Sequence, residues 1–123
     1  METEADILLI EDDPFMRELV SLSLRDAGYR VAEFSGQGWL FLLEAFAARV
    51  VIVDVSDPKS GSRKVIDALR VRFPAASIVA ISGYFHAGPA MAGAVARQLG
   101  VDRALAKPFG SSELVGAVKA LLG

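Results

Sequence analysis

The stretch that most constrains the fold is Val50-Val51-Ile52-Val53-Asp54, a β-branched run that ends on a carboxylate. Four apolar residues in a row, bounded by Arg49 and by the loop signal Ser56-Asp57-Pro58, indicate a strand buried on both faces. Such strands are typical of parallel sheets that are covered by helices. A carboxylate at the C-terminal end of such a strand lies where open α/β sheets place their ligand sites.

Three further strand-like stretches lead to polar groups in the same way. Ile7-Leu8-Leu9-Ile10 runs into Glu11-Asp12-Asp13, a strand expected over Ser77–Ser82 ends on Ser82-Gly83, and Asp102–Ala106 leads to Lys107-Pro108. If these strands are parallel, three carboxylates, a hydroxyl and an ammonium meet at one edge of the sheet. This convergence is the main functional signal in the sequence.

Helical segments separate the strands. Asp13-Pro14 predicts a helix start, with a capping carboxylate followed by proline at the first helical position, and Gly28 predicts its end. The spacing within this helix predicts an inward face of Met16, Leu19, Val20, Ser23 and Leu24. A strand is expected over Tyr29–Phe34, and helices over about Trp39–Ala48, Lys64–Arg72 and Tyr84–Gly100 and from Ser111 onward.

Strand–helix alternation five times over predicts an α/β fold, a doubly wound parallel sheet of five strands with five helices. With 123 residues, the chain is expected to be a single domain over 1–123. The net charge of −2 gives no electrostatic case for nucleic-acid binding, and the absence of cysteine excludes thiolate chemistry. An acidic N-terminus without a signal peptide, and no apolar run free of charges long enough to span a membrane, favour a cytoplasmic protein.

The predicted site suits a hard divalent cation and a phosphoryl group. Glu11, Asp12 and Asp54 would form an oxygen-rich pocket, and Mg²⁺ accepts one or two carboxylates together with a carbonyl and waters. A carboxylate can also act as a nucleophile and become an acyl phosphate. Mg²⁺ and Lys107 would then supply positive charge to the phosphoryl oxygens, and Ser82 would donate a hydrogen bond to them.

These motifs, taken in order, resemble the receiver domain of two-component response regulators. The resemblance rests on Glu11-Asp12, on Asp54 with Pro58 four residues on, on Ser82-Gly83 and on Lys107-Pro108-Phe109. It implies a flavodoxin-like sheet of order 2-1-3-4-5. It also implies that Asp54 accepts a phosphoryl group from a histidine kinase or a His phosphotransfer protein and then shifts conformation to control a downstream protein target.

The same resemblance implies the metal ligands. Asp12 and Asp54 would bind Mg²⁺ (or Mn²⁺ in its place) directly, the backbone carbonyl of Ser56 would be the third protein ligand, and Glu11 would act through a metal-bound water. Such a module is not a conventional enzyme, because it receives the phosphoryl group on its own Asp54 and at most removes it again by autodephosphorylation.

The resemblance also assigns the residues that respond to the phosphoryl group. Ser82 matches the switch hydroxyl, with Gly83 leaving access beside it, and Lys107 matches the phosphoryl-binding lysine. The Lys107–Pro108 peptide bond is expected to be cis. One position departs from the family: Ala104 stands where a tyrosine or phenylalanine is usual, so an atypical output is expected.

Two other functions stay open at this point. A receiver-like interaction domain that is not switched by phosphorylation is favoured by Ala104. A Mg²⁺-dependent phosphohydrolase with an aspartyl nucleophile is disfavoured, because Ser56 stands where such enzymes carry a second aspartate. Partners are expected to be proteins rather than nucleic acid or membrane, with a homodimer as an alternative if Trp39 is exposed. No output domain is expected in this chain.

Overall fold

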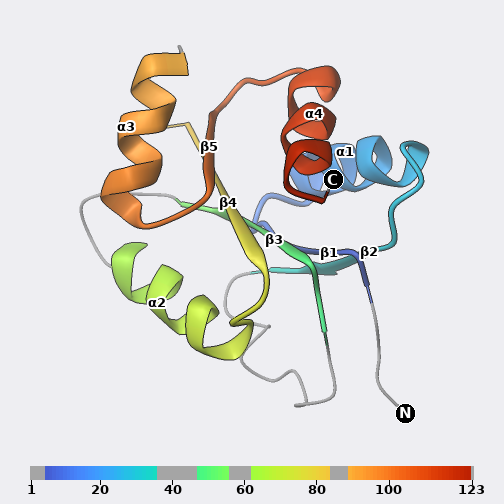
Figure 1. The fold of residues 1–123 in the computed structure, drawn as a ribbon. Helices are drawn as coiled ribbons and strands as arrows, with labels where there is room; N and C mark the ends of the chain where they lie inside the picture. Colours follow the sequence, from blue (N-terminus) through green and yellow to red (C-terminus); the bar gives the residue numbers. More distant parts are fainter. Residues whose placement is uncertain (1–4, 36–46, 56–61, 84–88, 123) are drawn as a thin grey trace.

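The structure is a computed structural model, which describes residues 5–35, 47–55, 62–83 and 89–122. These residues form five strands and four helices, in the order β1-α1-β2-β3-α2-β4-α3-β5-α4 (Figure 1). The strands are β1 Ile7–Ile10, β2 Val31–Phe34, β3 Val50–Asp54, β4 Ser77–Ser82 and β5 Arg103–Ala106. The helices are α1 Pro14–Asp26, α2 Ser62–Arg72, α3 Pro89–Leu99 and α4 Ser111–Leu122.

All five strands form one parallel sheet in the order β2-β1-β3-β4-β5. The predicted doubly wound fold and strand order are therefore confirmed. The fifth predicted helix, over about 39–48, lies outside the described residues except for its last two positions. Those two are not helical: Ala47 forms an isolated bridge, and its carbonyl accepts a hydrogen bond from the backbone N–H of Ala5.

The start of α1 follows directly from its sequence. Asp13 has extended backbone geometry, and its carboxylate accepts hydrogen bonds from the backbone N–H groups of Phe15 (3.0 Å) and Met16 (3.4 Å). Pro14 occupies the first turn, where its missing N–H has no partner to lose. Gly28, with φ of +99°, terminates the helix in the left-handed region that glycine adopts without strain.

The prediction for the inward face of α1 is wrong at one residue. Val20 and Leu24 are buried as expected, whereas Leu19 is 45% exposed. Helix α1 packs on the sheet through Val20 and Leu24. Leu19 precedes Val20, and one step along an α-helix is a rotation of about 100°, so the Leu19 side chain is turned away from that contact. Ser21, which was not predicted to face inward, is buried instead.

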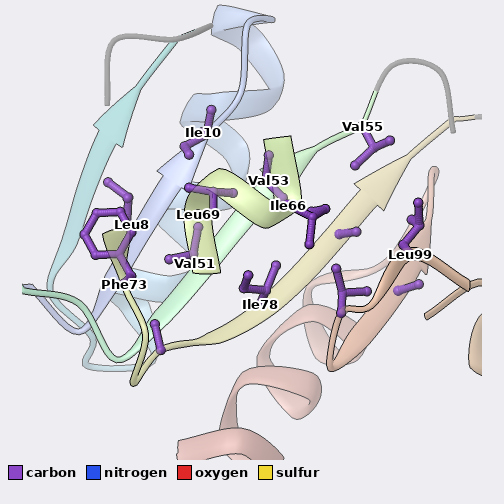
Figure 2. Close-up of a cluster of buried hydrophobic side chains, with 14 of the residues drawn as sticks. Leu8, Ile10, Val51, Val53, Val55, Ile66, Leu69, Phe73, Ile78 and Leu99 are labelled. Atoms are coloured by element: carbon purple, nitrogen blue, oxygen red, sulfur yellow. The ribbon is translucent and has the colours of Figure 1, made fainter. Parts of the chain in front are cut away.

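The core has two halves, one on each face of the sheet. Figure 2 shows the half beneath α2 and α3, where Leu8, Val51, Val53 and Ile78 of the strands meet side chains such as Leu69. On the other face, α1 and α4 cover strand residues that alternate with these, among them Ile7, Leu9, Ile52, Val79 and Ile81 (Figure 1). Burial on both faces explains why the central strands are continuous apolar runs.

A polar clamp closes the edge of the sheet at which the strands begin. Arg70 of α2 donates hydrogen bonds to the carbonyls of Ala76 and Gly100 and to the carboxylate of Asp102. Asp102 in turn accepts a 2.8 Å hydrogen bond from the backbone N–H of Ile78. These contacts join α2 to the starts of β4 and β5.

No helix among the described residues is long and apolar enough to cross a membrane.

Candidate functional site

The sequence-predicted site residues gather at the opposite edge, where the strands end. In the parallel register, Ile10 of β1 lies beside Val53 of β3, and Ser82 of β4 lies beside Ala106 of β5. Glu11, Asp54, Ser82 and Lys107 therefore each stand at the last residue of a strand or at the residue that follows it, and Asp12 stands one residue further along. The sheet brings groups that are far apart in sequence to one level.

Lys107 joins the acidic groups of this edge. Its Nζ lies 2.6 Å from Oε1 of Glu11 and 3.0 Å from Oδ1 of Asp54. Glu11 is only 1% exposed, whereas the side chains of Asp54 and Lys107 are each 21% exposed. Asp54 and Lys107 are therefore partly open to solvent, whereas Glu11 is enclosed by the protein.

The electrostatics of this cluster are those of two carboxylates that share one ammonium. Burial raises the pKa of Glu11 above its ordinary value, and the nearby charge of Asp54 adds to this rise, although the hydrogen bond from Lys107 opposes it. Burial works to lower the pKa of Lys107, but its hydrogen bonds to Glu11 and Asp54 outweigh that effect, so this pKa is raised. Lys107 is thus held as a cation.

The backbone around Glu11 is fixed as well. Its N–H donates to the carbonyl of Phe34 on β2, and its own carbonyl accepts a 2.8 Å hydrogen bond from Nη1 of Arg17. Arg17 is not among the site residues predicted from the sequence. A signal was nevertheless present: an arginine close to the start of a helix opposes the helix dipole, which suggests that a specific acceptor holds it there.

The other predicted residues have different environments. Asp12 is exposed at the turn between β1 and α1, next to the capping residue Asp13. Ser82 is fully buried at the end of β4, and its carbonyl accepts a 2.9 Å hydrogen bond from the N–H of Lys107. Gly83 is exposed beside it, and no atom of the described residues, its chain neighbours aside, lies within 4 Å of the place a Cβ would take.

Three further positions complete the predicted set. The Lys107–Pro108 peptide bond is cis, as the resemblance implied. Ala104 is 5% exposed and belongs to the half of the core beneath α3. Ser56, whose carbonyl is the predicted third metal ligand, lies outside the described residues, as does Trp39.

The donor atoms suit a hard cation with few protein ligands. Within the described ranges, no three Asp, Glu, His or Cys side chains lie close enough together to hold a metal ion by themselves. Mg²⁺ does not need such a cage, since it retains several waters and binds through one or two carboxylates. When both carboxylates are ionised, Glu11 and Asp54 carry one more negative charge than Lys107 neutralises, which a divalent cation would compensate.

Comparison with known proteins places this geometry in context. The family model described as the response regulator receiver domain matches residues 7–119. The chain is 30% identical over 118 residues to the probable transcriptional regulatory protein TcrX of Mycobacterium tuberculosis, covering 94% of this chain and 49% of that protein. It is 31% identical over 127 residues to the response regulator Rre1 of Synechocystis, covering 99% of this chain and 53% of that protein. The chain thus spans about half the length of these two relatives.

A solved structure agrees with this comparison. A response regulator protein from Burkholderia pseudomallei superposes with a TM-score of 0.72 at 25% identity, covering 95% of this chain and 66% of that one. That protein was crystallised with a phosphorylated aspartic acid, a calcium ion and citrate.

Proposed function

The chain belongs to the family of response regulator receiver domains, and on this premise we propose that it is a phosphoacceptor signalling module whose Asp54 receives the phosphoryl group. One observation carries the proposal. Asp54 ends the central strand with its side chain 21% exposed, and the ammonium of Lys107 lies 3.0 Å from Oδ1. An accessible carboxylate beside a fixed cation is the arrangement that phosphoryl transfer to a carboxylate requires.

The proposed transfer is a displacement at phosphorus. A carboxylate oxygen of Asp54 attacks the phosphorus atom and forms a P–O bond. The bond from phosphorus to the donor breaks, and the leaving group keeps its electron pair: the imidazole of a phosphohistidine or the carboxylate of an acyl phosphate. Lys107 would stabilise negative charge on the phosphoryl oxygens, because its ammonium is already held next to Asp54.

A divalent cation is part of the proposal. Asp12 and Asp54 would hold Mg²⁺, or Mn²⁺ in its place, together with the carbonyl of Ser56, and Glu11 would act through a bound water. When bound, the cation would neutralise charge on the phosphoryl oxygens. The excess negative charge of Glu11 and Asp54 supports this assignment, and the Burkholderia relative with its calcium ion and phosphorylated aspartic acid gives it a precedent.

Phosphorylation would be coupled to conformation through Ser82. Its side chain has no exposed surface in this structure. A hydrogen bond from its hydroxyl to a phosphoryl group on Asp54 would couple the end of β4 to the phosphorylated state. Such a coupling would shift the population between two conformers. The phosphodonor would be a histidine kinase or a His phosphotransfer protein and the output a protein target; the cytoplasmic location stays a prediction.

Ala104 favours a second candidate, a receiver-like interaction domain that phosphorylation does not switch. Ala104 is buried in the core beneath α3, and its partner in the register, Ala80, is equally small. A methyl group has no rotamers, so this position offers no aromatic side chain that could swing between a buried and an exposed state. Under this alternative, Asp54 could be phosphorylated without a change in α3.

The test is the intact mass of the protein after incubation with acetyl phosphate and Mg²⁺. The wild type is expected to gain one phosphoryl group, and Asp54→Asn to gain none. Asp13→Asn is the matched control, because Asp13 is a neighbouring carboxylate whose hydrogen bonds cap α1. Labelling of the wild type and of Asp13→Asn, both abolished by a prior chelator, supports the proposal. An unlabelled wild type contradicts it.

A further inference from the structure

Arg17 reaches from α1 back over the turn that carries the acidic residues. Its Nη1 donates a 2.8 Å hydrogen bond to the backbone carbonyl of Glu11, and its Nε lies 3.9 Å from Oε1 of Glu33, the third residue of β2. The Arg17 side chain is 24% exposed, so it lies against the protein rather than in solvent. One guanidinium therefore connects the end of β1, the end of β2 and the start of α1.

The carbonyl that Arg17 holds belongs to the peptide that joins Glu11 to Asp12. Glu11 is already fixed at its other polar groups, through its N–H to Phe34 and through its carboxylate to Lys107. The hydrogen bond from Arg17 fixes the remaining freedom, which is rotation of the Glu11–Asp12 peptide plane. That plane sets the direction in which the chain, and with it the Asp12 carboxylate, leaves the sheet.

Arg17 acts by orientation more than by its charge. Glu33 compensates the positive charge of Arg17, and Glu33 is itself held by a 3.2 Å contact with Nη2 of Arg25. Arg25 also donates to the carbonyl of Val31, so the ion-pair partner of Arg17 is anchored on β2 from a second side. The fork of the guanidinium suits two acceptors at once, which a lysine ammonium on a flexible stem does not match.

We infer that Arg17 is a positioning residue, which presets the Glu11–Asp12 peptide so that its carboxylates can take up the divalent cation. The inference rests on the proposed function, since it concerns the cation needed for phosphoryl transfer to Asp54. It goes beyond that proposal by assigning a role to a side chain that touches neither the cation nor the phosphoryl group. Residues that orient metal ligands in this way typically alter metal affinity by about 10–100-fold when they are replaced.

The test compares Arg17→Gln and Arg17→Lys with the control Arg25→Gln. Arg25 lies on the same helix and binds the same Glu33, but within the described part of the chain its guanidinium donates to Val31 and Glu33 and not to Glu11. Binding of Mg²⁺ to the unphosphorylated full chain is measured by isothermal titration calorimetry with magnesium chloride. Acetyl phosphate labelling at several Mg²⁺ concentrations, and thermal unfolding, are recorded on the same samples.

Arg17→Gln is expected to raise the Mg²⁺ dissociation constant about tenfold, and Arg17→Lys to raise it by a smaller factor. Arg25→Gln should stay within about twofold of the wild type, and labelling of Arg17→Gln should recover at saturating Mg²⁺, because the nucleophile Asp54 is unchanged. A purely structural role would lower the unfolding temperature and leave Mg²⁺ affinity at the wild-type value.

Several results would overturn the inference. Wild-type Mg²⁺ affinity in Arg17→Gln, or equal weakening in Arg17→Gln and Arg25→Gln, rules out a specific positioning role. If Arg17→Gln does not fold, Arg17→Lys decides, and unchanged Mg²⁺ affinity in that variant rules the role out. Failure of the proposed function can be distinguished from failure of this inference. If the wild type gains no phosphoryl group, the proposed function is wrong. If the wild type is labelled but the Arg17 variants bind Mg²⁺ with wild-type affinity, only this inference is wrong.

Discussion

Replacing Lys107 by methionine removes the ammonium shared by two carboxylates while keeping an unbranched side chain of similar length. The lost contacts are those of Nζ with Glu11 at 2.6 Å and with Asp54 at 3.0 Å. Water cannot easily take the place of the ammonium at Glu11, which is 1% exposed. Breaking a buried ion pair by removing one partner typically costs about 3–5 kcal/mol of the free energy of unfolding.

Protonation of Glu11 sets an upper bound on that cost. Keeping Glu11 protonated in the folded variant costs free energy relative to the unfolded chain, where the carboxyl ionises with its ordinary pKa of 4.5. This cost is about 1.4 kcal/mol for each pH unit above 4.5, which gives about 3.4 kcal/mol at pH 7. We therefore expect Lys107→Met to lose about 3 kcal/mol at pH 7. At about pH 5.5 the bound falls to about 1.4 kcal/mol, so the loss at that pH should be no larger than about 1.4 kcal/mol.

Urea unfolding followed by circular dichroism, in a chelating buffer at both pH values, measures the two losses. Lys119→Met is the matched control, because Lys119 is an exposed lysine on α4; its effect should be small at both pH values. A loss in Lys107→Met that is the same at both pH values would refute the reasoning, because the cost would then not come from the charge of Glu11. A loss no larger than that of Lys119→Met would refute it too.

Three further predictions concern single residues. Because burial raises the pKa of Glu11, the folded state binds the carboxyl proton more tightly than the unfolded chain does, so the free energy of unfolding should fall as pH rises from about 4.5 through the raised pKa. Glu11→Gln should remove this pH dependence, measured by urea unfolding at several pH values. The same pH dependence in the variant and the wild type would contradict the prediction. Asp13→Ala removes the cap of α1 and should cost about 1 kcal/mol by the same assay; no loss would show that the cap is dispensable. Ser21 is 3% exposed, and its Oγ is the buried side-chain atom that lacks a hydrogen-bond partner among the described residues. Ser21→Ala should therefore be neutral or stabilising by up to about 1 kcal/mol in thermal unfolding, and a clear loss would reveal an unseen partner.

The central strands could be predicted to the residue, because burial on both faces leaves an unmistakable apolar run. The observed bounds of β1, β3 and β4 are those expected. The outer strands are shorter than expected, and side chains explain both differences. The N–H of Arg30 donates to the carboxylate of Asp6 before β2 begins, and Asp102 uses its carboxylate to bind Ile78 before β5 begins. In both cases a side-chain carboxylate accepts the hydrogen bond of a backbone N–H at the end of the sheet where the strands begin.

The cluster of Glu11, Asp54 and Lys107 could be predicted in its members but not in its contacts. The sequence places Glu11, Asp54 and Lys107 at strand ends, and parallel pairing then brings them to one edge. Lys107 lies closer to Glu11 than to Asp54. This difference depends on the twist of the sheet and on side-chain rotamers, which cannot be read from the spacing of residues in the sequence. The hydrogen bond from Arg17 to a backbone carbonyl is harder still to foresee, because the acceptor can belong to any residue.

The polar clamp of Arg70 and Asp102 has a practical consequence for protein engineering. It lies at the edge where the strands begin, a full strand length from Asp54, and its contacts join α2, β4 and β5 without involving a residue of the proposed site. The clamp and the proposed site therefore lie at opposite ends of the same strands. A more heat-resistant version of this protein, for use as the sensing part of an artificial circuit, would best be sought by redesigning the clamp, because changes there leave the reacting groups in place.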